Sequence, residues 1–300
     1  MLDLTVIILT YNEELHIRRC LENVAPIAKQ IFVIDSYSTD RTLEIAREFE
    51  NVQVLQNKWT NYATQFNWAL QNAPVTTKWV LRLDADEYLS EELKSELRDR
   101  LPSLPSEYTG IIFPLRRVFL GKTIRCGMNQ VKLMRMFQYG KAQIEGRQMD
   151  EHIQLIEGKA IEFKYEFADD NLNNLSWWTQ KHVGYAIREA VDLLDIELGL
   201  TGAAETDDNK HISAQALAKR MKKHKYARQP LFWRAFAYFC YRYFFKLGFT
   251  EGKEGFLWHF LQGWWYRTLV DAKIYEIKRA CGTDKDKIKQ YLKEHYNITI

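Results

Sequence analysis

Two carboxylates, Asp84 and Asp86, directly follow the apolar segment 79–83. Alternate residues of a strand point to the same side, so both side chains can face one ion at the strand end. Proteins commonly hold Mg²⁺ or Mn²⁺ with one or two carboxylates together with the phosphates of a substrate. We therefore predict a metal site at Asp84 and Asp86. The alternative is a solvated acidic turn that begins the next helix.

Two other apolar segments, 4–9 and 30–34, also end in polar residues. Nucleotides bind at the carboxyl edge of parallel sheets, where backbone amides and short polar side chains meet the ligand. A carboxylate at this edge could accept a hydrogen bond from the N3–H of uracil or from a ribose hydroxyl. Helix capping is the alternative, although Asp40 fits that role better than Asp35. The predicted nucleotide contacts are Thr10, Asn12, Glu13 and Asp35.

A third cluster, Asp150, Glu151 and His152, combines two acids with a histidine. Transfer of a sugar with inversion needs a base that takes a proton from the acceptor hydroxyl, and a carboxylate performs this well. Acidic clusters also arise by chance, so this prediction depends on the metal and nucleotide residues upstream. We predict that Asp150 or Glu151 is the base, with His152 in a structural or supporting role.

Other polar side chains could contact a diphosphate or an acceptor. Gln65 and Asn67 lie on a predicted helix, from which they could reach a diphosphate. Basic side chains are more often simply solvated, so their assignment is weaker. The basic candidates for phosphate or acceptor contacts are Arg135, Arg147, Lys181 and Arg188.

Strands and helices alternate along the first hundred residues, which predicts a parallel, doubly wound α/β sheet. Further along, two strand-like stretches predict a mixed extension of that sheet, and the rest of the chain is predominantly helical. The predicted strands are 4–9, 30–34, 52–56, 79–83, 109–119 and 131–137, and the predicted helices are 13–24, 41–49, 62–71, 91–101 and 174–199, with the chain wholly helical from 213 to about 296.

The chain has 300 residues, 46% of them hydrophobic, with a formal net charge of +3. We expect a catalytic domain over residues 1–210 and a basic, aromatic helical region over 211–300. The four cysteines have no metal-binding spacing, and the N-terminus lacks the pattern of a signal peptide, which together predict a cytoplasmic protein. The chain contains no run of about 18 uncharged apolar residues, so we predict no membrane-spanning helix.

The C-terminal region is rich in cations and aromatic rings. Residues 211–250 hold nine Lys or Arg and no acid, and residues 226–249 hold eleven aromatics. On a helix beginning after Pro230, Arg234, Arg242 and Lys246 would form one cationic stripe. This composition suits the surface of an anionic membrane. Packing on the catalytic domain or in a homo-oligomer is the alternative, whereas the dense aromatics and lack of an RNA-binding motif argue against nucleic acid.

In order and spacing, three segments resemble the family 2 inverting glycosyltransferases, which have a GT-A fold. These are Thr10–Glu14, Val33–Asp40 and Asp84–Glu87. Within the family, the chain is most similar to the lipopolysaccharide-core β-glucosyltransferases. That narrower resemblance rests on Asp150–His152 and Lys246–Phe256.

The resemblance implies a GT-A (Rossmann-like, doubly wound mixed) sheet, a nucleotide-sugar donor such as a UDP-sugar, and a Mg²⁺ or Mn²⁺ ion. It places Asp35 on the base or ribose, Asp84 near the ribose and diphosphate, and Asp86 on the metal. The acceptor would be a glycan or lipid-linked glycan at the inner face of the cytoplasmic membrane. The Gln-x-x-Arg-Trp motif of processive synthases is missing, which favours transfer of a single sugar.

Two other functions remain as alternatives. A nucleotidyltransferase would share the nucleotide-binding sheet, but it would normally carry a glycine-rich loop after the first strand, where this chain has none. A catalytically inactive membrane adaptor would keep the fold and use only the C-terminal region. The intact Asp84, Asp86 and Asp150–Glu151 argue against an adaptor.

Overall fold

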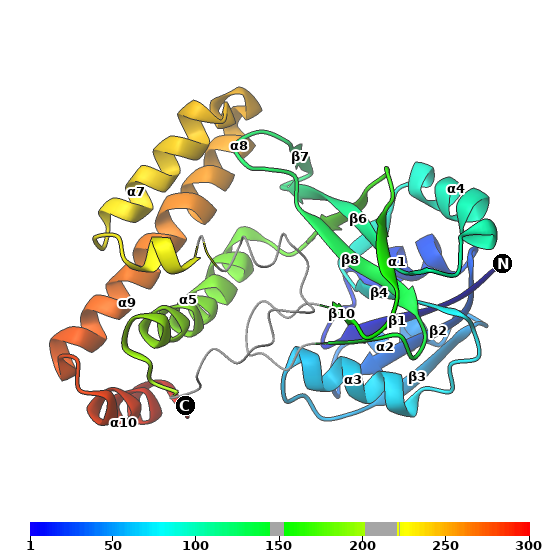
Figure 1. Cartoon of the computed structure of the whole chain (residues 1–300), viewed down its shortest axis with the longest axis horizontal. Helices are drawn as coiled ribbons and strands as arrows, with labels where there is room; N and C mark the ends of the chain where they lie inside the picture. Colours follow the sequence, from blue (N-terminus) through cyan, green and yellow to red (C-terminus); the bar gives the residue numbers. More distant parts are fainter. Residues whose placement is uncertain (145–152, 202–220, 222) are drawn as a thin grey trace. The chain divides into compact units, whose positions relative to one another are not determined.

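In a computed structural model of the chain, the structure describes residues 1–144, 153–201, 221 and 223–300. The chain forms two compact units (Figure 1). The sheet unit comprises Met1–Ile124 and Gln130–Leu172, and the helical unit comprises Arg125–Asn129 and Asn173–Ile300. The predicted domain boundary at residue 210 lies outside the described residues.

Four parallel strands form one half of the main sheet, as the sequence predicts. The sheet runs in the order β3-β2-β1-β4-β8-β6-β12-β5, so β1 lies between β2 and β4. The helices between these strands were predicted as well. The elements are β1 (Leu2–Thr10), α1 (Ile17–Val24), β2 (Ala28–Asp35), α2 (Thr42–Ala46), β3 (Val52–Gln56), α3 (Tyr62–Asn72), β4 (Trp79–Asp84) and α4 (Glu91–Arg100), followed by the 3-10 turn η1 (Leu101–Ser103).

The other half of the sheet is mixed, which confirms the predicted extension. β8 (Lys132–Gln138) runs antiparallel to both β4 and β6 (Tyr108–Phe119). β12 (Phe167–Asp170) is parallel to β6 and antiparallel to β5 (Glu87–Leu89). β5 begins at Glu87, the last residue of the acidic motif. The remaining short strands are β7 (Lys122–Ile124) and β11 (Lys159–Glu162), which pair with β6, and the separate pair β9 (Ala142–Ile144) and β10 (Ile153–Leu155).

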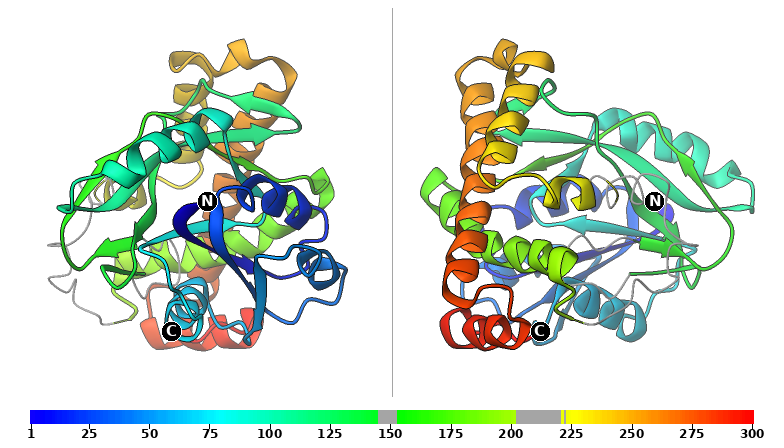
Figure 2. Two further views of the ribbon diagram at one scale, coloured as in Figure 1. Left: turned by 90° about the vertical axis from the view of Figure 1, so that its right-hand side faces the viewer. Right: turned by 60° about the vertical axis from the view of Figure 1, so that its left-hand side comes forward.

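The sheet unit has an apolar layer on each face of its sheet. Alternate residues of β1 enter different layers, with Val6 and Ile8 in one and Ile7 and Leu9 in the other. The first layer is covered by α1, α2 and α4, and the second by α3 (Figure 2). Burial on both faces explains why β1 is a continuous apolar run rather than an alternating one.

The helical unit is built around α5 (Leu175–Leu198), which begins at the capping residue Asn174 and ends at Gly199. Buried apolar side chains of α5, α9 and α10 share one core. The chain is not helical throughout, because Leu247 and Gly282 have positive φ angles and interrupt it. The other elements are α7 (Trp233–Cys240), η3 (Tyr241–Phe245), η4 (Gly248–Glu251), α8 (Gly252–Trp258), η5 (His259–Trp265), α9 (Tyr266–Cys281) and α10 (Lys285–Tyr296).

The predicted cationic stripe is wrong for its two arginines, Arg234 of α7 and Arg242 of η3. Arg234 and Arg242 are only 5% and 3% exposed. Arg234 forms an ion pair with Asp271 of α9, with its Nη2 atom 2.5 Å from Oδ1, and Asp271 is fully buried. A buried cation needs such a partner, and the spacing of the arginines could not show where the partner lies. Within the described part of the chain, no helix has the length and hydropathy of a membrane span.

Candidate active site

Three predicted site residues meet at the carboxyl edge of the parallel strands. The register pairs Thr10 with Asp35, and it pairs Leu9, the neighbour of Thr10, with Asp84. Neighbouring strands lie about 4.8 Å apart, so the ends of β2, β1 and β4 form one short row. The predicted convergence of polar side chains at this edge is therefore present.

Asp35 is fully buried at the end of β2 and is held in one orientation. Its Oδ1 atom accepts hydrogen bonds from the hydroxyls of Ser38, at 2.5 Å, and Thr10, at 3.4 Å. Its Oδ2 atom accepts from the backbone N–H of Ser38 and from Gln56 Nε2, both at 3.0 Å. Gln56 ends β3, so a fourth strand contributes to the same edge, which the sequence patterns did not reveal.

The turn after β1 is tied to the turn after β2. Asn12, with a positive φ of 56°, accepts the backbone N–H of Thr39 on its Oδ1 atom at 2.8 Å. The backbone N–H of Glu13 donates to Thr42 Oγ1 at 2.8 Å. These bonds show that the side chain of Asn12 takes part in local capping interactions, as the alternative interpretation allowed. They also fix both turns as one surface beside Thr10.

Asp84 lies at the centre of a charged network. Tyr62 donates its hydroxyl to Asp84 Oδ1 at 2.5 Å, and Arg82 Nε donates to the same Tyr62 oxygen at 2.7 Å. Arg135 Nη2 lies 3.4 Å from Asp84 Oδ2. Burial alone would raise the pKa of Asp84, but Arg135 and Arg82 outweigh it and the pKa lies below its usual value. Asp84 is therefore a carboxylate kept ionised by its neighbours.

Arg135 and Glu87 form a buried ion pair behind Asp84. Glu87 Oε2 also accepts the backbone N–H of Asp84 at 3.0 Å. Burial raises the pKa of Glu87 well above its usual value, while the nearby Arg135 acts to lower it. Arg135 was a candidate for phosphate contact. It is only 6% exposed, and its contacts with Glu87 and Asp84 position the acidic motif.

Asp86 is the carboxylate of the motif that is best placed for a metal ion. Its Oδ2 atom accepts one hydrogen bond, from Asn171 Nδ2 at 2.9 Å. Its Oδ1 atom accepts none from the residues that the structure describes. No group of three or more potential ligand residues is arranged as a metal site among them. A carboxylate with a free oxygen still fits an ion that takes most of its ligands from substrate phosphates and water.

Asp169 is an additional acid at this edge that the sequence patterns missed. It lies on β12, where the register pairs it with Glu87 of β5 and Arg117 of β6. Burial raises the pKa of Asp169 to about 6, and the negative charge of Asp86 contributes to the rise. Its position could not be found from the sequence because β12 is a four-residue strand without an alternating pattern.

The other candidates lie elsewhere or are already engaged. Gln65 is fully buried and bonds through its amide to Asn57 and Ser36. Asn67 exchanges two hydrogen bonds with the backbone of Ile144. Lys181 and Arg188 lie on α5, in the helical unit. Arg147, Asp150, Glu151 and His152 lie outside the described residues.

The sequence of the sheet unit matches a known family. Residues 5–148 match the model of glycosyl transferase family 2. An uncharacterised glycosyltransferase of Rickettsia typhi is 36% identical over 97 residues, which cover 32% of each chain. The lipopolysaccharide core biosynthesis glycosyltransferase LpsC of Rhizobium meliloti is 30% identical over 113 residues, covering 36% of this chain and 40% of LpsC. The chain thus spans only about a third of the length of the curated relatives it matches.

Solved structures give a distant likeness. The superposition on S. aureus TarS (residues 1–349, in complex with UDP-GlcNAc) covers 98% of this chain and 92% of the TarS chain. Its TM-score is 0.47 and the sequence identity is 15%. By the family match, residues 5–148 resemble a family 2 glycosyltransferase, the family that the motifs indicated. The described chain has a mixed sheet of parallel and antiparallel strands followed by C-terminal helices, as predicted.

Proposed function

We propose that this protein is a metal-dependent, inverting glycosyltransferase. It transfers one sugar from a nucleoside diphosphate sugar, most simply a UDP-sugar, to a hydroxyl of a glycan or lipid-linked glycan. The observation that carries this proposal is the row of carboxylates formed by Asp35 and Asp84 at one sheet edge, with Asp86 two residues after the end of β4, inside the segment that matches family 2. The resemblance to LpsC supports lipopolysaccharide or cell-surface polysaccharide synthesis as the setting.

The residues of the row take different roles in this proposal. Asp35, already fixed by four hydrogen bonds, receives the nucleoside base or ribose beside Thr10. Asp86, with Asp84, would hold a Mg²⁺ or Mn²⁺ ion, which when bound stabilises the negative charge of the leaving diphosphate. Asp84 keeps its charge through Arg135 and Arg82 and faces the ribose and diphosphate.

The base in this proposal is Asp150 or Glu151. It takes the proton from the acceptor hydroxyl, and the hydroxyl oxygen attacks the sugar carbon from the face opposite the diphosphate. Attack from that face converts an α-linked donor into a β-linked product. The choice between the two acids needs the separate variants Asp150→Asn and Glu151→Gln, with the product anomer identified by NMR.

We place the enzyme in the cytoplasm, attached to the inner face of the membrane through its helical region. The alternatives remain a nucleotidyltransferase and an inactive adaptor. The family match disfavours the first, and the ordered network around Asp84 disfavours the second, because an adaptor has no need of it.

The proposal is tested with purified protein and a panel of nucleotide sugars. Donor binding by calorimetry and donor hydrolysis are measured with and without Mn²⁺, for the natural chain and for Asp86→Asn. We expect one donor to bind in a metal-dependent way and Asp86→Asn to lose at least tenfold in affinity. Asp99→Asn, which changes an exposed acid on α4, is the matched control and should bind normally. Equal donor binding by Asp86→Asn would contradict the metal assignment.

A further inference from the structure

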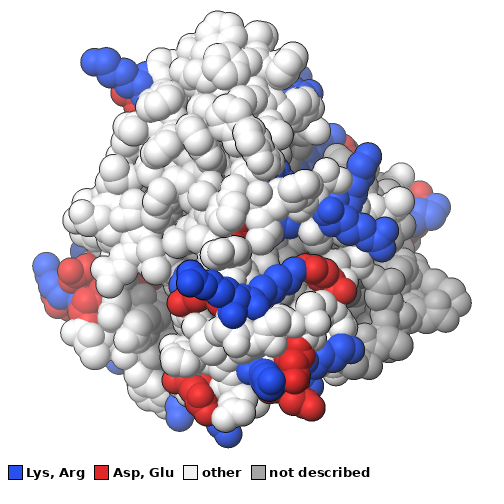
Figure 3. Space-filling model, turned by 90° about the vertical axis from the view of Figure 1, so that its left-hand side faces the viewer, with Lys and Arg blue, Asp and Glu red and all other residues white. Residues whose placement is uncertain are grey.

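The segment 241–257, which we call the aromatic tip, exposes an unusual amount of apolar surface. It comprises η3, η4 and α8 of the helical unit. In Figure 3, the surface over α7 and the tip shows almost only uncharged side chains among the residues described there. Exposed apolar patches of this kind mark contact with a protein or a membrane. The exposed side chains are Tyr241 (48%), Phe244 (55%), Phe245 (79%), Leu247 (53%), Phe249 (50%) and Phe256 (43%).

The adjoining helix α7 has the reverse of the usual polarity of a surface helix. Its arginine, Arg234, is buried against Asp271, and Arg242 of η3 is buried as well. Its outer side carries Trp233, which is 72% exposed, and Phe236. A soluble helix normally turns its aromatics inward and its arginines outward. The reversal extends the apolar surface of the aromatic tip along α7.

The aromatic tip is held firmly, so its exposure is part of the fold. The backbone N–H of Gly127 donates to the carbonyl oxygen of Lys246 at 2.8 Å. Glu251 accepts the backbone N–H groups of Arg125 and Cys126. The fully buried His259 packs so closely on Gly248 that a Cβ atom there would lie 2.5 Å from its ring. These contacts fix the turn that presents Leu247 and Phe249.

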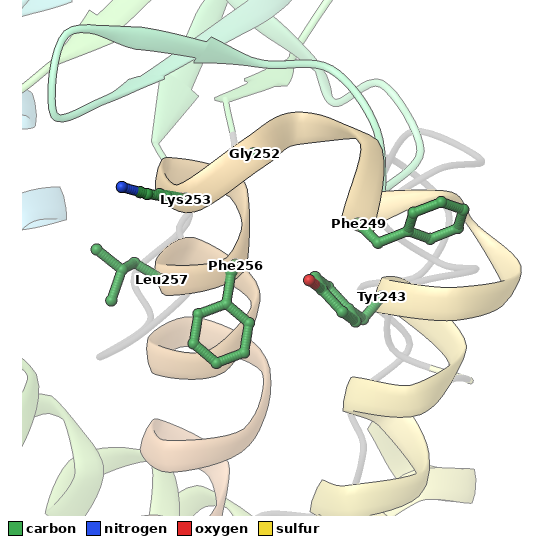
Figure 4. A pocket seen from close by; sticks show the side chains of 6 residues that line it. All are labelled: Tyr243, Phe249, Gly252, Lys253, Phe256 and Leu257. Carbon is green, nitrogen blue, oxygen red and sulfur yellow. The ribbon is translucent and has the colours of Figure 1, made fainter.

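A hollow of about 550 Å³ opens within the aromatic tip, between η3 and α8 (Figure 4). Tyr243 and Phe256 contact each other edge to face in its wall, with their ring centroids 5.8 Å apart. Phe249 and Leu257 complete its apolar lining, and Lys253 lies at its edge. An apolar recess with a cation beside it matches a lipid, whose chain is apolar and whose headgroup carries a phosphate.

The charges of the aromatic tip favour an anionic partner. Lys246 and Lys253 are exposed among the aromatics, and Arg125 is exposed on the adjoining loop. Of the two acids, Glu251 is buried in the contacts described above and Glu254 is partly buried. The exposed charge is therefore mainly positive, which matches the anionic headgroups of a membrane. In a twofold contact between two copies, the same lysines would approach each other and repel.

We propose that the aromatic tip enters the interface of an anionic phospholipid bilayer. Phe245 and Phe249 reach the acyl region, while Lys246 and Lys253 contact the phosphates. The proposal goes beyond the donor site, because it needs neither the metal nor the nucleotide. It names the surface through which the proposed membrane attachment takes place.

The test is co-sedimentation of the full chain with phosphatidylcholine vesicles, with and without phosphatidylglycerol. We expect the natural chain to bind the anionic vesicles and the double variant Phe245→Ser, Phe249→Ser to bind at least tenfold more weakly. Lys246→Gln with Lys253→Gln should lose about tenfold, and only on anionic vesicles. Tyr275→Ser, which removes a 52% exposed aromatic on α9, should bind like the natural chain.

Several results would overturn the proposal. One is a natural chain that does not bind anionic vesicles, and another is an equal loss in Tyr275→Ser and the tip variant. A third result combines two measurements: light scattering shows a dimer for the natural chain and a monomer for the tip variant, while both bind vesicles equally. That result would assign the tip to contact with a second copy of the chain. Circular dichroism checks folding of each variant. Donor binding, measured on the same samples, separates a failure here from a failure of the proposed transferase.

Discussion

At the scale of single residues, the acidic motif is defined by the side chains behind it. Asp84 is contacted by Tyr62 and Arg135, and Tyr62 is in turn contacted by Arg82, whose guanidinium lies 3.9 Å from the Tyr62 ring centre. In the proposed function Asp84 faces a diphosphate, and a carboxylate in that position repels the phosphates unless nearby cations offset its charge. Arg82, on the same strand β4 as Asp84, and Arg135, on the neighbouring strand β8, supply these cations. Tyr62 is therefore a positioning residue for Asp84.

Tyr62→Phe tests this role. The ring and its contact with Arg82 remain, but Asp84 loses one hydrogen bond, so we expect kcat/KM for the donor to fall about tenfold. Kinetics at varied donor and Mn²⁺ concentrations measure the effect. Tyr139→Phe removes a hydroxyl that, among the described residues, bonds to the Leu70 carbonyl, and it should leave the kinetics unchanged. Unaltered kinetics in Tyr62→Phe would show that the hydroxyl does not position Asp84.

At the scale of elements, one buried ion pair joins α7 to α9. Asp271 accepts from Arg234 Nε at 2.8 Å and from the backbone N–H of Phe232 at 2.7 Å. Arg234 also donates to the carbonyl oxygen of Ala227 at 2.9 Å. Each charge compensates the other, although both side chains are buried. The ion pair determines which side of α7 faces inward, and hence which side carries the exposed aromatics.

Loss of one partner should destabilise the helical unit strongly. We expect Arg234→Leu to lower the free energy of unfolding by about 3–5 kcal/mol, because Asp271 is left buried without its cation. The double variant Arg234→Leu, Asp271→Leu should recover most of that loss. Urea unfolding followed by tryptophan fluorescence measures each value. Lys278→Gln, which breaks a more exposed pair with Glu197, should cost no more than about 1 kcal/mol. If the double variant recovers none of the lost free energy of unfolding, Arg234 and Asp271 do more than compensate each other's charge.

At the scale of the whole molecule, the features that carry the two proposals lie in two different compact units. The family 2 match and the carboxylate row belong to the sheet unit, and the aromatic tip belongs to the helical unit. Each unit has its own apolar core. A ligand stabilises the part of a protein whose folded form binds it. The two units should therefore respond differently to a nucleotide.

Hydrogen exchange detected by mass spectrometry tests this division. UDP with Mn²⁺ should slow amide exchange in β1, β2 and β4 and leave α9 and α10 unchanged, because the proposed donor contacts lie in the sheet unit. Arg234→Leu should speed exchange in α7 and α9 and leave β1 and β2 unchanged. Protection of the whole chain by the nucleotide, equal in both units, would contradict this prediction.

The sequence by itself predicted the parallel strands, the helices between them and the placement of Asp35 and Asp84 at one edge. It could do so because strands buried on both faces are continuous apolar runs, and the polar residues that end them are conspicuous. β5, β7, β9, β10, β11 and β12 escaped prediction, since strands of three or four residues carry no readable alternation. Asp169 was missed for that reason.

Only the tertiary structure decided which partners these residues meet. Periodicity placed Arg234 and Arg242 on one side of a helix, but it could not say that this side faces inward, because the compensating Asp271 lies 37 residues from Arg234 in the sequence. The same holds for Arg135, which meets Glu87 across 48 residues. The local pattern specifies which residues share a face, whereas contacts between distant segments determine what that face touches.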